Sequence, residues 1–291
     1  MFEGVLPAIV TPFQRNPGMD LDLEGLRSNI EFLVCQGVHG IVPCGSTGES
    51  ATLSFEEHDQ VIAATIDQVN GRVPVLAGTG SNNTEEAVRL TRAARDLGAD
   101  GVLVISPYYN KPNRSGLIKH YHRLADLDIP VVAYNVPGRT GQNLLPDLVA
   151  ELAEHPNIVG IKEASGDIGQ VSRIIEETLD LDFQVISGDD NLTLPILSLG
   201  GGGVISVAAN VQPARMVAMF DYFLEGDLEM ALDLHYELSP LFRSMFIDTN
   251  PIPVKKAVEL LGMAGGPVRL PLDELDAKKT EQLREVLCQY D

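Results

Sequence analysis

The stretch Ile158-Val-Gly-Ile-Lys-Glu-Ala-Ser-Gly166 has the pattern of a buried strand that ends on a single lysine, Lys162. Alternation along a strand places Lys162 on the same face as Gly160 and Ile158. Burial disfavours the charged form of an amine, and a neutral amine can attack a carbonyl carbon to form a Schiff base. The alternative is that this side chain extends to solvent or pairs with Glu163. Taken by itself the alternative is the commoner case, so the other motifs of the chain must decide between the two.

Short β-rich runs alternate with longer amphipathic runs along most of the chain. Strands are expected at Gly4–Val10, Gly40–Pro43, Pro74–Ala77, Gly101–Ile105, Pro130–Tyr134, Ile158–Lys162, Phe183–Ser187 and Gly203–Val207. Helices are expected at Asp22–Gln36, Ser54–Val69, Thr84–Leu97, Ser115–Leu127, Pro146–Glu154 and Gly169–Thr178. This alternation predicts an α/β fold, namely a closed (β/α)8 TIM barrel, with an open doubly wound sheet as the alternative.

The strand pattern stops after about residue 226. The remaining chain predicts helices at Leu228–Leu241, Pro253–Leu261 and Asp273–Cys288. We therefore expect a catalytic barrel over residues 1–226 and a small C-terminal helical domain over residues 227–291.

Composition excludes several classes of function. The 291 residues include 21 Lys and Arg against 41 Asp and Glu, for a net charge of −20, which disfavours binding to nucleic acid or to an anionic membrane. The three cysteines lack the spacing of a disulfide framework or a metal site. The start of the chain lacks the pattern of a signal peptide, and no apolar run reaches the ~18 residues that span a bilayer. The expected location is the cytoplasm.

The loop Gly45-Ser-Thr-Gly-Glu49 directly follows a predicted strand. Its backbone amides and the hydroxyls of Ser46 and Thr47 can receive an anion, and a phosphate or a carboxylate would serve equally. Glycine and serine are also ordinary turn residues, so this motif is weak by itself.

The segment Tyr134-Asn-Val-Pro-Gly-Arg-Thr-Gly141 follows another predicted strand. It places Tyr134 at the strand end and Arg139 in the loop beyond. Because catalytic groups of a barrel lie at the C-terminal ends of strands, Tyr134 is expected near Lys162. A phenol there can carry protons, and a guanidinium can bind a carboxylate through two parallel hydrogen bonds. The alternative for Tyr134 is a packed ring with one hydrogen bond.

Together these motifs resemble the dihydrodipicolinate synthase (4-hydroxy-tetrahydrodipicolinate synthase) family over essentially the whole chain. The resemblance is carried by Gly45-Ser-Thr-Gly-Glu49, Ser106-Pro-Tyr-Tyr-Asn110, Tyr134-Asn-Val-Pro-Gly-Arg139, Gly160-Ile-Lys-Glu-Ala164, Ser187-Gly-Asp-Asp190 and Asn250-Pro-Ile-Pro-Val-Lys255. The tyrosine and lysine motifs are shared with sister pyruvate aldolases, including sialic acid lyase and 2-keto-3-deoxygluconate aldolase. The arginine of the tyrosine motif and the last of the six motifs resemble the synthase in particular.

The resemblance implies a reaction and a set of residues for it. Lys162 would form a Schiff base with pyruvate, and Tyr134 would move protons with help from Ser46 and from Tyr109 of a neighbouring subunit. The implied substrate-binding residues are Thr47 for the pyruvate carboxylate, the backbone of Ile205, Gly188, and Arg139 for the carboxylate of aspartate semialdehyde. No metal or organic cofactor is implied, and the expected assembly is a homotetramer of two tight dimers acting in lysine and diaminopimelate biosynthesis.

Family members also bind lysine as a feedback inhibitor at the tight dimer interface. The matching positions are Ser50, Ala51, His58, Asn82, Glu86 and Tyr108. Phe55 stands where lysine-sensitive enzymes often carry a histidine, so lysine control is expected to be weak or absent. The loop departs from the synthase pattern Gly-Thr-Thr-Gly-Glu at Ser46, which keeps the hydroxyl. The alternatives are a sister aldolase acting on a sugar acid and a barrel without catalytic activity.

Overall fold

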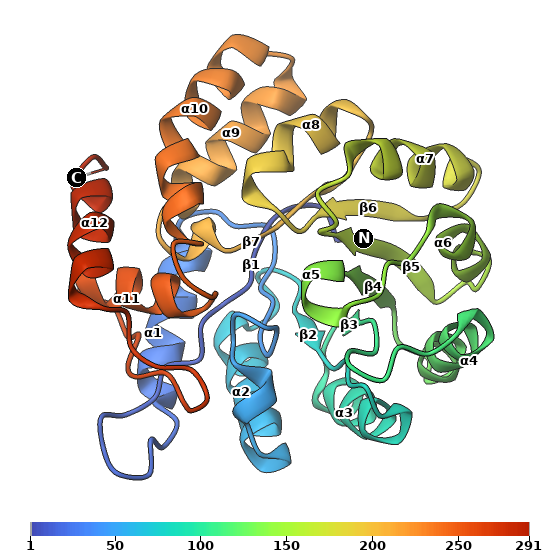
Figure 1. The fold of residues 1–291 in the computed structure, drawn as a ribbon, viewed down its shortest axis with the longest axis horizontal. Helices are drawn as coiled ribbons and strands as arrows, with labels where there is room; N and C mark the ends of the chain where they lie inside the picture. The colour runs from blue at the N-terminus through green and yellow to red at the C-terminus, as the bar shows by residue number, and fades with distance from the viewer. Residues whose placement is uncertain (1, 291) are drawn as a thin grey trace.

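The computed structural model describes residues 2–290 and shows an α/β fold built on one curled parallel sheet. The sheet order is β1 (Gly4–Pro7), β7 (Gly203–Ser206), β6 (Gln184–Ser187), β5 (Ile158–Glu163), β4 (Val131–Asn135), β3 (Gly101–Ile105) and β2 (Leu76–Gly78). Every pairing between neighbouring strands is parallel. Figure 1 shows the strands at the centre and the helices around them.

The strand expected at Gly40–Pro43 appears as two isolated parallel bridges. Val42 forms one with Ala8, just beyond β1. Ile41 forms the other with Val75, just before β2. This segment therefore lies between the two outer strands of the sheet order.

Helices alternate with the strands and then continue without them. The first nine are α1 (Leu23–Cys35), α2 (Phe55–Val69), α3 (Thr84–Leu97), α4 (Arg114–Ala125), α5 (Pro137–Thr140), α6 (Pro146–Ala153), α7 (Ile168–Thr178), α8 (Thr193–Ser198) and α9 (Pro213–Glu225). The last three are α10 (Leu228–Ser244), α11 (Ile252–Leu260) and α12 (Ala277–Leu287). The six helices expected before residue 180 are confirmed, with ends that differ by at most two residues.

Local sequence signals explain several helix ends. Ser54 and Glu57 form the expected capping box at the start of α2. Gly37 and Gly98 take the left-handed conformation beyond α1 and α3, with φ of +85° and +97°. The expectation that the last helix starts at Asp273 is wrong, because the side chain of Asp276 accepts a hydrogen bond from the backbone of Lys279 and begins the helix there.

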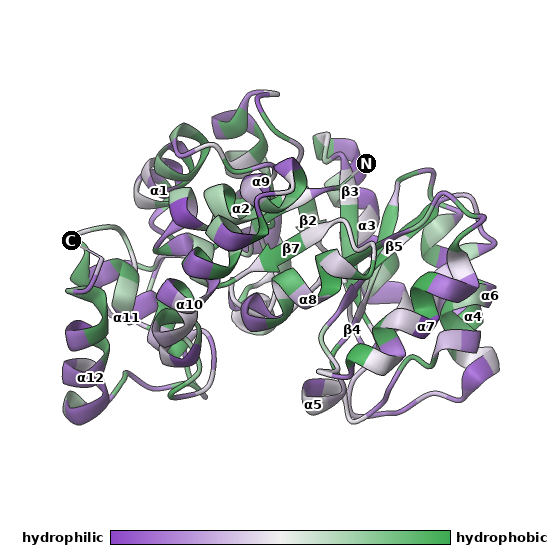
Figure 2. Ribbon diagram, turned by 90° about the horizontal axis from the view of Figure 1, so that it is seen from above, coloured by the Kyte–Doolittle hydropathy of each residue, from purple (hydrophilic) through white to green (hydrophobic). Residues whose placement is uncertain are grey.

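Two apolar layers pack on the two faces of the curled sheet. The inner layer, inside the curl, includes Leu6, Leu103, Val132, Ile186 and Ile205. The outer layer lies between the strands and the surrounding helices. Figure 2 shows helices in which hydrophobic and hydrophilic residues alternate along the chain, as expected of helices with one apolar face.

The prediction that Ile158 shares a face with Lys162 is wrong. Ile158 packs in the outer layer with Ile161, whereas Val159 contacts the inner layer. The pairing of β4 with β5 shifts by one residue just before Gly160. Such a bulge inserts one extra residue and reverses the alternation on one side of it. The alternation from Gly160 to Lys162 is as predicted, so the lysine still points to the inner layer.

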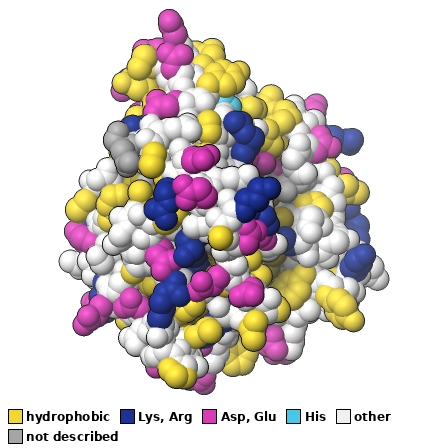
Figure 3. All heavy atoms as spheres, turned by 60° about the vertical axis from the view of Figure 1, so that its left-hand side comes forward, with side chains coloured by type: hydrophobic (Ala, Val, Ile, Leu, Met, Phe, Trp, Pro, Cys, Tyr) yellow, Lys and Arg dark blue, Asp and Glu magenta, His cyan; other side chains and the backbone are white. Residues whose placement is uncertain are grey.

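Helices α10, α11 and α12 share a separate apolar cluster with α9 and with the end of the sheet at β1 and β7. Figure 3 shows the side of the molecule on which α10, α11 and α12 lie in Figure 1. On this side, acidic and basic side chains are intermixed, with hydrophobic side chains scattered between them. Within residues 2–290, no helix is both long enough and apolar enough to cross a membrane. The cysteines at 35, 44 and 288 are free.

Candidate active site

Lys162 and Tyr134 lie side by side at the C-terminal ends of two neighbouring strands. The two residues are opposite one another in the register of β4 and β5. The Nζ atom of Lys162 lies 4.4 Å from the centroid of the Tyr134 ring. Both side chains are buried, at 6% and 8% exposed. The expected pairing of an amine with a phenol is therefore present in the fold.

Burial changes the protonation of both groups. Burial lowers the pKa of Lys162 from 10.5 to about 8, Asp190 opposes this decrease, and Arg139 adds to it. Burial also raises the pKa of Tyr134 to about 12, against a smaller opposite effect of Arg139. A substantial fraction of the amine is therefore neutral at mildly alkaline pH, while the phenol keeps its proton.

A cavity of about 160 Å³ opens onto the Lys162 amine. Its walls include Gly45, Ser46, Thr47, Tyr134, Val136, Arg139, Gly188, Val207, Phe246 and Asn250. Gly188 leaves room beside the amine, because a Cβ atom at that position would lie 3.0 Å from Cε of Lys162. A small carbonyl compound fits a space of this size.

Polar groups at the cavity are tied to one another across the chain. The guanidinium of Arg139 donates to the backbone carbonyl of Asn250 (2.9 Å). The side-chain amide of Asn250 donates to the hydroxyl oxygen of Thr47 (3.0 Å). The hydroxyl proton of Thr47 is therefore free to point to a bound anion, and Arg139 keeps further N–H donors for a carboxylate.

Two expected residues lie away from this cavity. Tyr109 is 89% exposed and has a left-handed backbone with φ of +72°. Its side chain is thus not part of the site within one subunit. Ile205 is fully buried in the inner apolar layer, and Val207, two residues further along the chain, lines the cavity instead.

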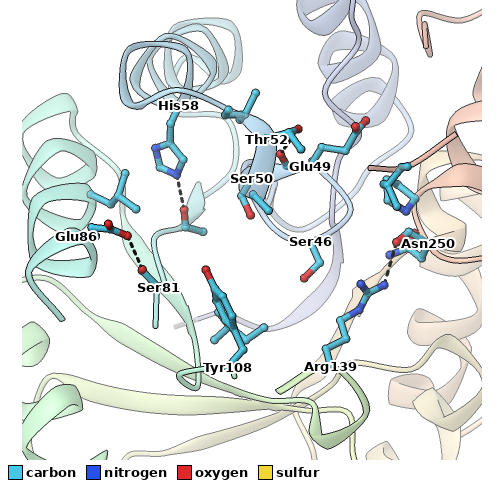
Figure 4. A pocket seen from close by; sticks show the side chains of 18 of the residues that line it. Ser46, Glu49, Ser50, Thr52, His58, Ser81, Glu86, Tyr108, Arg139 and Asn250 are labelled. Atoms are coloured by element: carbon cyan, nitrogen blue, oxygen red, sulfur yellow. Dashed lines mark hydrogen bonds between the residues drawn. The ribbon is translucent and has the colours of Figure 1, made fainter. Parts of the chain in front are cut away.

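A second cavity of about 420 Å³ adjoins the first and shares Ser46, Arg139 and Asn250 with it. Five of the six residues expected at the lysine effector site line it: Ser50, Ala51, His58, Glu86 and Tyr108. Figure 4 shows how Ser50, His58, Glu86 and Tyr108 lie around this space. Asn82 is not in its wall and instead donates from its side chain to the backbone carbonyl of Tyr108 (3.1 Å). Phe55 lines this cavity, and the Arg89 guanidinium lies 4.7 Å from the centroid of its ring.

Sequence reasoning missed the contributions of Asn250 and Asp190, although both lie in motifs that it singled out. Asn250 joins Thr47 to Arg139, and its buried Oδ1 atom has no hydrogen-bond partner among residues 2–290. Asp190 is buried and accepts hydrogen bonds from Ser206 (2.5 Å) and from two backbone amides, at Val207 (3.1 Å) and Ala208 (3.0 Å). Both are polar residues in motifs that lie next to predicted strands or helices. That position was the only sequence signal that could have indicated their roles.

Within the described residues 2–290, no group of three or more His, Cys, Asp and Glu side chains is placed to hold a metal ion. The buried carboxylate of Glu163 instead accepts hydrogen bonds from the side chains of Asn135 and Gln170. It also accepts one from the backbone of Ser165 (2.6 Å). Glu163 is therefore occupied on the outer face of β5 and does not pair with Lys162.

Comparison with known proteins shows the family. The chain matches the Dihydrodipicolinate synthetase family over residues 1–290. It is 76% identical over 290 residues to the 4-hydroxy-tetrahydrodipicolinate synthase of Methanoculleus marisnigri, with 100% of each chain covered. The dihydrodipicolinate synthase structure from Thermotoga maritima superposes with a TM-score of 0.96 at 43% identity, covering 99% of this chain and 98% of the other. The lysine-bound enzyme from Cyanidioschyzon merolae gives 0.94 at 42% identity, covering 99% and 98%.

The fold and site thus define an α/β protein with a buried amine of lowered pKa at the C-terminal end of a strand in a parallel sheet. The chain belongs to the dihydrodipicolinate synthase family.

The buried amine gives a first prediction. Only the neutral amine is a nucleophile, so acetylation of Lys162 by a trace of acetic anhydride should speed up with pH, with a midpoint of about 8, and level off above it. N-acetyl-lysine, measured at each pH as the standard, should have a midpoint near 10.4, as an ordinary lysine does. Mass spectrometry of the peptide that contains Lys162 measures the rate. A midpoint near that of the standard would contradict the effect of burial.

Proposed function

We propose that this chain is a 4-hydroxy-tetrahydrodipicolinate synthase, which condenses pyruvate with L-aspartate 4-semialdehyde in lysine and diaminopimelate biosynthesis. The observation that carries the proposal is the buried amine of Lys162, with a pKa near 8 and the Tyr134 ring beside it, at the base of a small cavity. The relative at 76% identity is named for this activity, and its similarity extends over both chains completely.

The reaction follows from a neutral amine beside a protonated phenol. Lys162 attacks the keto carbon of pyruvate, and loss of water leaves an iminium on Nζ. The iminium withdraws electrons, so the methyl group of pyruvate loses a proton and becomes an enamine. The enamine carbon attacks the aldehyde carbon of the second substrate, whose oxygen takes up a proton. The amine of that substrate then displaces Lys162 from the iminium carbon, which closes the ring and frees the enzyme.

Tyr134 suits the proton transfers in this sequence. Its phenol keeps its proton at neutral pH, since burial raises its pKa to about 12. It can therefore donate a proton to the oxygen that leaves as water and recover one in a later step. Ser46 and Tyr109 of a neighbouring subunit would continue the proton path. The exposed position of the Tyr109 side chain supports such a contribution to another subunit.

The two carboxylates have separate partners in the proposed complex. Thr47, with the backbone amides of its loop, would hold the carboxylate of pyruvate close to Lys162, with Gly188 providing space. Arg139 would bind the carboxylate of the semialdehyde further out, where it lines both cavities. Ile205 would support the pyruvate pocket from the inner apolar layer.

We further propose the closed (β/α)8 barrel over residues 1–226, followed by a C-terminal helical domain over residues 227–291. The bridges of Ile41 and Val42 to the outer strands support closure of the barrel. The separate apolar cluster of α9 to α12 supports the helical domain. The proposal also includes a cytoplasmic homotetramer of two tight dimers. The chemistry needs no added cofactor, because the iminium on Lys162 is itself the electron sink.

A sister aldolase acting on a sugar acid is the competing function, since it would use the same amine and phenol. Arg139 favours the synthase, because a short aldehyde with its own carboxylate matches a guanidinium that lines both cavities. A barrel without catalytic activity is disfavoured, since nothing in a binding role requires a buried amine of lowered pKa.

The role of Tyr134 gives a second prediction. The substitution Tyr134→Phe keeps the ring beside Lys162 but removes the proton donor. We expect kcat to fall by roughly 10²-fold or more, the scale of a lost general acid or base. Thermal unfolding is expected to change little, because the substitution removes a single oxygen atom and keeps the buried ring in place. A coupled assay of the condensation measures the rate, and an unchanged kcat would assign Tyr134 to packing alone.

Arg139 gives a third prediction, which separates the synthase from a sister aldolase. Charge-assisted hydrogen bonds contribute ~1.5–3 kcal/mol each, so Arg139→Ala should lower kcat/KM for aspartate semialdehyde by roughly 10–10³-fold. Binding of pyruvate at Lys162 should change far less, since Thr47 and its loop hold that carboxylate. The wild type is assayed in parallel with sialic acid and 2-keto-3-deoxygluconate. Faster cleavage of either compound than condensation of the semialdehyde would reject the proposed substrate.

The second cavity gives a fourth prediction, on lysine control. Phe55 cannot hydrogen-bond a ligand, and its ring lies against the guanidinium of Arg89. Micromolar lysine should therefore leave the initial rate of the wild type unchanged. The variant Phe55→His offers the missing polar group and should be more sensitive to lysine than the wild type. Micromolar inhibition of the wild type would show that the other five residues of this wall suffice.

A further inference from the structure

Glu49 and Lys255 form an ion pair deep inside the protein. Their side chains are 1% and 2% exposed, and Nζ of Lys255 lies 2.6 Å from Oε1 of Glu49. For comparison, the partly buried pair of Arg269 with Glu57 has side chains that are 14% and 25% exposed. The proposed reaction uses neither member of the buried pair, although Lys255 ends the motif that begins at Asn250. Burying two opposite charges is costly in itself and is tolerated only where the remaining polar atoms are satisfied.

The surroundings of the pair satisfy both charges. Lys255 also donates to the backbone carbonyl of Pro267 (2.6 Å), and its Nζ atom lies 4.3 Å from the centroid of the Phe13 ring. The second oxygen of Glu49 accepts a hydrogen bond from the backbone amide of Arg269 (3.0 Å). Burial lowers the pKa of Lys255, whereas the charge of Glu49 raises it. The carboxylate is thus fixed at both oxygens by the segment from α11 to Arg269.

Glu49 is the last residue of the loop that carries Ser46 and Thr47 into the active-site cavity. Its backbone is left-handed, with φ of +53°, which a residue with a side chain adopts at a cost. The turn is closed by a hydrogen bond from the amide of Gly48 to the carbonyl of Gly45 (3.0 Å). Figure 4 shows that the side chain of Glu49 points away from the centre of the cavity, whereas that of Ser46 points into it. The ion pair therefore holds the loop from behind.

The C-terminal segment contacts this loop at two separate places. Asn250 donates to the hydroxyl oxygen of Thr47, and Lys255 of α11 binds Glu49 two residues further along the loop. These two contacts connect residues more than 200 positions apart in the chain. A strained turn anchored at both points has little freedom to move Thr47.

We propose that Glu49 and Lys255 are positioning residues, which hold the Thr47 hydroxyl and the loop amides where they bind the carboxylate of pyruvate. This inference rests on the proposed function, because it assigns the loop to pyruvate. The helical segment that follows the sheet thereby takes part in substrate binding without touching the substrate. A buried ion pair suits this task because its attraction and hydrogen bonds fix one arrangement, whereas an apolar contact tolerates several.

The test replaces the ammonium in Lys255→Met and compares it with Lys256→Met. Lys256 is the next residue of the same helix and pairs with Glu259 (2.6 Å), without contact to the loop. Borohydride trapping at Lys162 is measured against pyruvate concentration. We expect the pyruvate concentration for half-maximal trapping to rise at least tenfold in Lys255→Met and to stay within twofold in Lys256→Met. The KM for the aldehyde should change less than that for pyruvate.

Two further variants separate positioning from general stability. Lys255→Arg keeps the positive charge and should recover part of the pyruvate affinity. The double variant Glu49→Gln and Lys255→Met removes both charges, so no unpaired charge stays buried. It replaces Lys255→Met in the pyruvate test if that single variant does not fold. A folded single or double variant with the wild-type dependence on pyruvate would overturn the proposal.

Hydrogen exchange of the ligand-free protein tests the anchoring without any activity. The amides of Gly48 and Glu49 donate to carbonyls of the same turn, at 3.0 and 3.2 Å, and should exchange slowly in the wild type. Exchange there should accelerate at least tenfold in the double variant, while that of α3 stays unchanged. If the wild type traps no pyruvate, the proposed function fails, but exchange still decides whether the pair anchors the loop. Unchanged exchange in this turn would reject the anchoring.

Discussion

The site depends on the desolvation of one amine. Water stabilises an ammonium ion strongly, and the inner face of the sheet offers Lys162 an aromatic ring and apolar neighbours in place of water. The charge of Asp190 restores only part of this stabilisation, so the pKa decreases to about 8. Because burial destabilises the ammonium form, part of the amine is neutral, and therefore nucleophilic, near physiological pH. The surrounding fold must then be stable enough to hold a group that would be more stable in water.

The fold meets this requirement by parallel register and by contacts that are remote in sequence. Register places Tyr134 opposite Lys162 on adjacent strands, and hydrogen bonds within the sheet fix both backbones. The loop with Thr47 is not fixed by the sheet in the same way. It is held instead by Asn250 and Lys255, from the helical segment that follows the last strand. The amine and the proposed carboxylate site thus have different structural supports.

Most of the architecture could be predicted from the sequence, because its strands and helices carry clear periodicity and caps. The side of the sheet on which Ile158 lies could not be predicted, because the bulge in β5 arises from pairing with β4 and has no local sequence signal. Helix α9 was not anticipated either, although its first residue is a proline that is compatible with a helix start.

For the site, too, features with a local sequence signal could be predicted, whereas features that arise from packing could not. Lys162 and Tyr134 occur at strand ends, so a parallel sheet brings them together by rule. Other features of the site depend on how the loops pack, which cannot be read from the spacing of residues in the sequence. These features are the burial of both side chains, the cavity beside Gly188, and the position of Val207 in its wall in place of Ile205. The pairing of Glu49 with Lys255 was equally hidden, because attraction between two residues 206 positions apart leaves no local pattern.

The most direct measurement is reduction with borohydride in the presence of pyruvate, followed by mass spectrometry of the digested protein. A reduced three-carbon unit is expected on Lys162 and on no other lysine. Excess aspartate semialdehyde, which turns the intermediate over, should lower the trapped fraction. Labelling of another lysine, or no labelling in a folded and active enzyme, would contradict a Schiff base at Lys162.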